Sequence, residues 1–88
     1  MVEKELIVSN PKGIHARPSA EIAKAANNFK SEITLIKENV QADAKNILSL
    51  LMLCIPYKTA VTIRASGKDE KEALQAVVEA FNKRFDNG

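Results

Sequence analysis

The spacing of apolar residues switches repeatedly between a strand period and a helix period, which restricts the folds open to this chain. Val61, Ile63 and Ala65 alternate with polar residues across 59–66, a pattern that predicts a half-buried strand. Further strands are predicted at 3–9, 31–37 and 40–43, and helices at 16–28, 46–53 and about 70–84. The order β-α-β-β-α-β-α predicts an α+β fold of two layers, with the helices on one side of an antiparallel sheet.

Length and composition predict one domain spanning residues 1–88. A chain of 88 residues has no room for two cores, and 45% hydrophobic with 27% charged residues is typical of soluble proteins. The net charge of +2 and the aromatic content of 5% argue against nucleic-acid binding. A single cysteine excludes an internal disulfide, and neither a membrane span nor a signal-peptide pattern is present. The expected location is the cytoplasm.

The first helix has a recognisable start. Pro18 is tolerated in a first turn, where its missing N–H costs little, so the helix is predicted to begin at Ala16 with His15 as its N-cap. Its apolar side is predicted to hold Ala16, Ala20, Ile22, Ala23, Ala26 and Phe29. Between the second and third strands, Glu38-Asn39 suits a tight turn.

The last helix carries signals at both ends. Asp69 is the predicted N-cap, with Glu72 in the reciprocal position of a capping box. Lys83 and Arg84 lie where the helix dipole favours cations. The predicted buried stripe consists of Ala73, Leu74, Val77, Val78, Phe81 and Phe85.

His15 is the only histidine of the chain and the strongest candidate for chemistry. It lies in Gly13-Ile14-His15-Ala16-Arg17-Pro18, at a predicted helix N-terminus and two residues before an arginine. Helix N-termini present N–H groups and about half a positive charge, so they hold anions. A neutral imidazole is nucleophilic near pH 7. These features together suggest a phosphoryl group on His15.

Other roles for His15 remain open on residue type alone. A lone surface histidine is most often solvated or a simple helix cap. A metal site would need more ligands than His15 and Cys54, which have no close spacing. A hydrolase triad lacks a Gly-x-Ser-x-Gly turn or a reactive-cysteine context.

The hexapeptide resembles the active-site segment of the HPr family, the histidine phosphocarriers of the bacterial phosphotransferase system. The resemblance extends over nearly the whole chain and includes the Ala65–Glu70 stretch before the last helix. It implies an open-faced β-sandwich with strand order 1-4-2-3. It also implies a stoichiometric phosphoryl carrier, not an enzyme, that receives phosphate from enzyme I and passes it to a IIA domain, without metal or cofactor. A monomer is expected.

The resemblance also assigns roles within the site. It implies that His15 is phosphorylated on Nδ1 and that Arg17 balances the phosphate charge. The backbone N–H groups of Ala16 and Arg17 are the implied hydrogen-bond donors to the phosphate.

The helix at 46–53 is apolar all round, and a chain of this size can hardly bury every side of it. An exposed apolar face usually binds a partner. The resemblance places Ile47, Leu48 and Leu51 in a docking surface, to which we add Lys24, and turns Leu50 and Leu53 toward the core. The basic residues Lys12, Arg17, Lys24 and Lys45 are either ordinary solvated cations or a face that attracts acidic partners.

Some residues depart from the family pattern. Asn46 stands where many members carry a regulatory serine, and Ser49 replaces a usual glycine. Leu50–Leu53 is more similar to NPr, the nitrogen-branch relative. The alternative function is therefore a nitrogen-branch or other regulatory module, whose phosphorylation state is sensed by its partners.

Overall fold

The computed structural model describes residues 1–83. The elements are β1 (Val2–Ile7), α1 (Ala16–Ala26), β2 (Glu32–Lys37), β3 (Val40–Asp43), α2 (Ile47–Met52), β4 (Ala60–Ser66) and α3 (Glu70–Asn82). All seven predicted elements are present in the predicted order, and only their ends differ.

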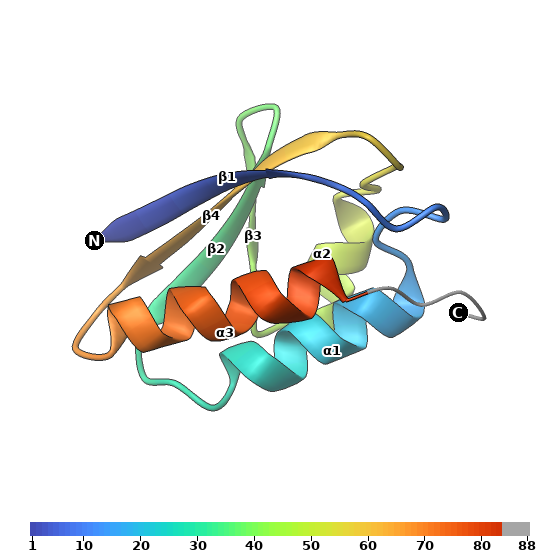
Figure 1. The fold of residues 1–88 in the computed structure, drawn as a ribbon. Helices are drawn as coiled ribbons and strands as arrows, with labels where there is room; N and C mark the ends of the chain where they lie inside the picture. Colours follow the sequence, from blue (N-terminus) through green and yellow to red (C-terminus); the bar gives the residue numbers. More distant parts are fainter. Residues whose placement is uncertain (84–88) are drawn as a thin grey trace.

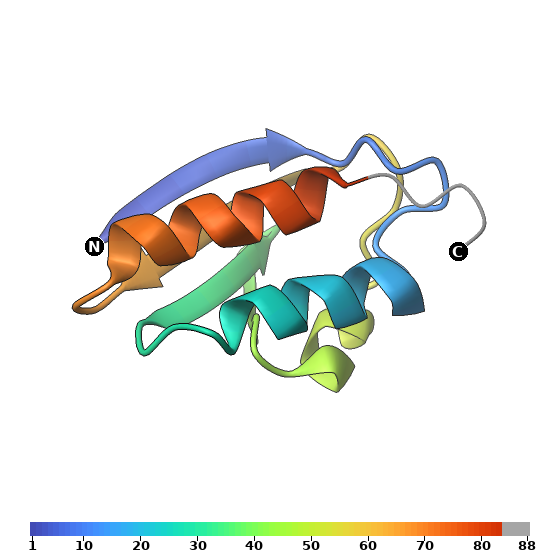
Figure 2. The ribbon, with the colours of Figure 1, turned by 60° about the horizontal axis from the view of Figure 1, so that its bottom comes forward.

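The four strands form one antiparallel sheet in the order β1-β4-β2-β3, which confirms the topology implied by the family resemblance. The three helices cover one face of this sheet and leave the other face open (Figures 1 and 2). Helices α1 and α3 lie side by side, and α2 lies beside α1. The fold is therefore the expected open-faced sandwich.

The core lies between the sheet and the helices. The inward residues of the two central strands are buried, among them Leu35 of β2 and Ile63 of β4, both 0% exposed. Ile22 of α1 and Phe81 of α3 fill the helical side of the same cluster. Alternation along the strands thus predicts the buried face correctly.

The turn between β2 and β3 is as tight as predicted. Glu38 and Asn39 both have positive φ angles, 50° and 69°. Two successive residues with positive φ are typical of a type I′ turn, whose twist matches that of the flanking strands.

The buried side of α1 differs from the prediction at its first turn. Ala16 is exposed and Ala20 is half-buried, whereas Pro18 and Ser19 are buried together with Ile22, Ala23 and Ala26. Phe29 lies beyond the end of the helix and is half-buried against the core. The prediction was wrong at Ala16. Alanine and serine are small and of intermediate hydropathy, so they do not indicate which side of a first turn is buried.

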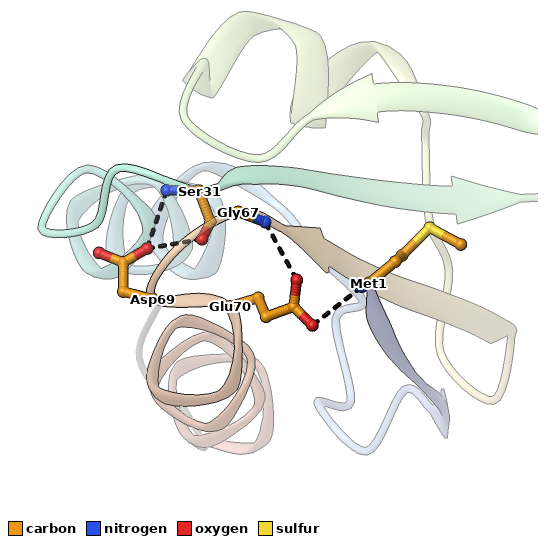
Figure 3. A network of polar contacts seen from close by, with 5 residues as sticks. All are labelled: Met1, Ser31, Gly67, Asp69 and Glu70. Carbon is orange, nitrogen blue, oxygen red and sulfur yellow. Dashed lines mark hydrogen bonds and ion pairs between the residues drawn. The ribbon is translucent and has the colours of Figure 1, made fainter.

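The capping box predicted for α3 is absent from the structure of residues 1–83. Asp69 occupies the N-cap position, but its side chain makes no bond to the helix. Its carboxylate instead accepts hydrogen bonds from Ser31 N (2.9 Å) and Ser31 Oγ (2.5 Å) (Figure 3). It also accepts one from Lys30 N (3.0 Å). Three donors at the entry to β2 outcompete the N–H groups of α3.

The neighbouring carboxylate, that of Glu70, contacts two groups near the start of α3. Its Oε1 accepts from Gly67 N at 3.1 Å, and its Oε2 lies 2.9 Å from the amino group of Met1 (Figure 3). These contacts join the beginning of β1 to the start of α3. For α3 itself, Ala73, Val77 and Phe81 are buried as predicted. Arg84 and Phe85 lie outside the described residues.

The Asp69 contacts predict an acid-sensitive stability. The Ser31 hydroxyl, followed by the Lys30 amide, holds the pKa of Asp69 at about 2, below the usual 3.8. A carboxylate with a lowered pKa in the folded state stabilises the fold above its unfolded pKa. The unfolding free energy is therefore expected to fall as the pH drops from about 4 to about 2. Urea unfolding of the parent chain and Ser31→Ala at several pH values measures this, and an equally steep acid loss in Ser31→Ala would contradict it.

Candidate functional site

The loop between β1 and α1 is held in a defined shape. Gly13 N donates to Asn10 O at 2.9 Å and closes a turn, and Ile14 N donates to Ile55 O at 2.8 Å. Gly13 has a φ of +74°, and a Cβ at this position would lie 2.4 Å from the Ile55 carbonyl oxygen. Only glycine fits this left-handed position without moving the backbone. The turn ends at Gly13, two residues before His15.

His15 is the N-cap of α1, as predicted. Its backbone is extended (φ −91°, ψ −159°), and its carbonyl accepts from Ser19 N at 3.0 Å. Its side chain makes no capping hydrogen bond to the backbone N–H groups of α1. The ring is half-buried, with Nε2 fully buried and without a hydrogen-bond partner among residues 1–83. With Nε2 buried, phosphorylation on Nδ1 stays the prediction.

The first turn of α1 begins directly after His15. Pro18 has no N–H, and Ser19 N donates to His15 O, so the N–H groups at the very start of the helix belong to Ala16 and Arg17. Ala16 and Arg17 are both exposed. Helix N-terminal N–H groups and a guanidinium both favour negative charge. The structure thus brings together His15, Ala16 and Arg17.

An apolar surface lies on α2. Its exposed members are Ile47 (44%), Leu48 (66%) and Met52 (73%), with Leu51 half-buried beside them, and we refer to these four residues as the α2 patch. Leu50 and Leu53 are buried as expected. Met52 is absent from the sequence-based docking set, although its i+4 spacing from Leu48 places both on one helix face.

Side-chain contacts fix the start of α2. Asn46 Oδ1 accepts from Ser49 N at 3.1 Å, so the asparagine caps the helix. Asn27, just after α1, donates to Lys45 O at 2.9 Å and ties the two helices together. The α2 patch is therefore held next to the helix that carries His15.

The basic residues of the predicted face differ in their surroundings. Lys24 lines a groove between α1 and α3 together with Glu21 and Lys83, and its docking role stays a prediction. Lys45 is half-buried and donates from Nζ to Phe29 O at 2.8 Å. Lys12 and Arg17 are exposed near His15. A role for Lys12, Arg17 or Lys24 in attracting acidic partners stays a prediction.

Within residues 1–83, no three His, Cys, Asp or Glu side chains gather as a metal ion would require. No helix in that range is long and apolar enough to cross a membrane.

Comparison with known proteins points to one family. The family described as "PTS HPr component phosphorylation site" matches residues 2–83. The chain is 42% identical over 84 residues to the phosphocarrier protein HPr of Mycoplasma pneumoniae, covering 94% of this chain and 96% of that protein. It is 38% identical over 85 residues to the Xylella fastidiosa HPr, covering 97% and 96% of the two chains.

Solved structures agree with the sequence matches. HPr of Thermoanaerobacter tengcongensis superimposes with a TM-score of 0.87 at 34% identity, covering 92% of this chain and 91% of that one. Crh of Bacillus subtilis, whose structure is described as a dimer with a swapped domain, gives a TM-score of 0.69 at 36% identity and covers 94% and 100%. Because this relative forms a dimer, the monomeric state of the present chain stays a prediction.

Proposed function

Because the chain belongs to the HPr family of phosphotransferase-system phosphocarriers, we propose that His15 accepts a phosphoryl group from phosphorylated enzyme I and passes it to a IIA domain. The observation that supports this most is the half-buried imidazole at the N-cap of α1, with Nε2 buried and Ala16 and Arg17 beside it. The phosphoryl group originates in phosphoenolpyruvate.

The transfer is a substitution at phosphorus. The lone pair on Nδ1 of the neutral imidazole forms the new N–P bond, while the bond from phosphorus to the donor atom breaks and its electron pair stays with the donor. The proton of the neutral ring remains on the buried Nε2. The N–H groups of Ala16 and Arg17 and the Arg17 guanidinium balance the charge on the phosphoryl oxygens. Positioning and charge stabilisation thus supply the catalysis.

A carrier must also release its phosphate. Many tight contacts to the phosphorylated state would stabilise it and slow the onward step. One arginine and one helix terminus hold the group only moderately, which suits reversible transfer. We infer that the protein acts stoichiometrically, once per phosphate, in the cytoplasm, without turnover of its own.

Incubation with enzyme I and phosphoenolpyruvate tests the proposal. We expect one acid-labile phosphate per chain, mapped to His15 by mass spectrometry under alkaline conditions. Addition of a IIA domain is then expected to remove it. Phosphate that is accepted but not passed to any IIA domain would favour the regulatory alternative, for which the NPr-like residues of α2 are the sequence argument.

Arg17→Ala is expected to slow phosphoryl exchange by roughly ten- to a hundredfold, because a charge-assisted contact contributes about 1.5–3 kcal/mol. The measurement is the rate of transfer from phosphorylated enzyme I in rapid-quench experiments. Lys71→Ala, which removes one exposed cation from α3, is the control for net charge. Equal rates for Arg17→Ala and Lys71→Ala would exclude a specific phosphate role.

A further inference from the structure

Asn10 is a buried polar residue in the loop that leads to His15. It is 1% exposed, and its side-chain Nδ2 donates to the carbonyl oxygen of Lys83 at 2.9 Å. The two residues are 73 positions apart in the chain. Burial of an amide is unfavourable unless it is hydrogen-bonded, so this contact defines where the side chain can lie. It therefore connects the loop to the far end of the fold.

Lys83 is the C-cap of α3, where backbone carbonyls lack partners within the helix. Its carbonyl receives the Asn10 bond, and its Nζ lies 3.5 Å from Glu21 Oε1 on α1. The end of α3 thus contacts the loop before His15 and the helix after it. Figure 2 shows the chain after β1 passing beside the C-terminal end of α3.

The backbone of Asn10 is fixed as well. Its carbonyl accepts from Gly13 N at 2.9 Å, so Asn10 begins the turn that ends two residues before His15. The neighbouring Ile14 is 4% exposed and bonded to Ile55 O, which holds the other side of the loop. The path of the chain into α1 is therefore determined by Ile55 on one side and by the end of α3 on the other.

We propose that Asn10 is a positioning residue for phosphoryl transfer, acting through the loop to align His15 with the N–H groups of Ala16 and Arg17. This inference rests on the proposed function of His15. Small displacements of reacting groups are costly, since a shift of about 1 Å can reduce a rate by about a hundredfold. Loss of the bond from Asn10 Nδ2 to Lys83 O removes one connection between the start of the loop and the end of α3, and so affects alignment more than docking.

Asn10→Ala tests the inference, with Ser31→Ala as a matched control. Ser31 is also 1% exposed and also bonds to the α3 region, but at the opposite end of the helix, through Asp69. We expect Asn10→Ala to lower the transfer rate at saturating phosphorylated enzyme I by about tenfold or more. Ser31→Ala should stay within about twofold of the parent rate, although both variants lose stability. Equal rates for the two variants, whether slow or normal, would overturn the inference.

Two additions keep the test decisive. Asn10→Leu fills a similar volume without a donor and replaces Asn10→Ala if the latter does not fold. In the free protein, the amide NMR signals of Ala16 and Arg17 should shift in the Asn10 variants and not in Ser31→Ala, and unshifted signals would also overturn the inference. Because this readout needs no enzyme I, it is separate from a failure of the parent chain to accept phosphate, which would refute the proposed function itself.

Discussion

His15→Ala is expected to fold like the parent chain and to accept no phosphate from enzyme I. The loss is complete because the chain contains no second histidine. The stability cost is small, since the His15 side chain makes no capping bond to α1. Even a bonded N-cap residue contributes only about 1 kcal/mol. Acid-labile phosphate, measured by mass spectrometry, and thermal unfolding, measured by circular dichroism, together check both halves of the prediction.

Two outcomes would contradict the prediction for His15→Ala. Labelling at the parent rate would show that another residue is the acceptor. A large loss of stability would show that the imidazole has a structural role, in which case absence of labelling would carry no information about chemistry. Arg17→Ala, slowed but still labelled at His15, completes the comparison.

Leu48→Asp is expected to weaken binding to enzyme I by at least about tenfold, equivalent to about 1.4 kcal/mol, without unfolding the domain. Leu48 is 66% exposed in the α2 patch, so a charge there remains solvated in the free protein. In the complex, the same charge would be desolvated against an apolar surface. Calorimetric titration with enzyme I measures the change, and the transfer rate at saturation should remain near that of the parent.

Two matched substitutions make the Leu48 result specific. Ile7→Asp places the same charge on another exposed apolar residue, 56% exposed on β1, and is expected to leave binding unchanged. Leu50→Asp buries the charge at a position that is 0% exposed and is expected to unfold the domain. If Leu48→Asp binds as tightly as Ile7→Asp, the docking surface lies elsewhere.

Features that depend on neighbours along the chain were predictable from the sequence. Strand alternation in 59–66 identifies the buried face of β4, because successive side chains point to opposite sides. Pro18 and the helical spacing after it place His15 at the N-cap of α1. The positive φ angles of Glu38 and Asn39 follow from local turn chemistry. The strand order came from family resemblance, since periodicity does not encode it.

Contacts between distant segments could not be predicted from the sequence. Aspartate is a common helix-capping residue, yet the Asp69 carboxylate accepts hydrogen bonds from Ser31, 38 residues away. Packing brings the Ser31 donors closer to the carboxylate than the N–H groups of its own helix. In α2, every residue of the run is apolar except Ser49, so local pattern cannot separate the buried Leu50 from the exposed Leu48 and Met52. The bond from Asn10 to Lys83 spans almost the whole chain. The types of the elements and the candidate acceptor, His15, could be predicted from the sequence, whereas the contacts around the loop before His15 could not, because those groups meet only when the helices pack on the sheet.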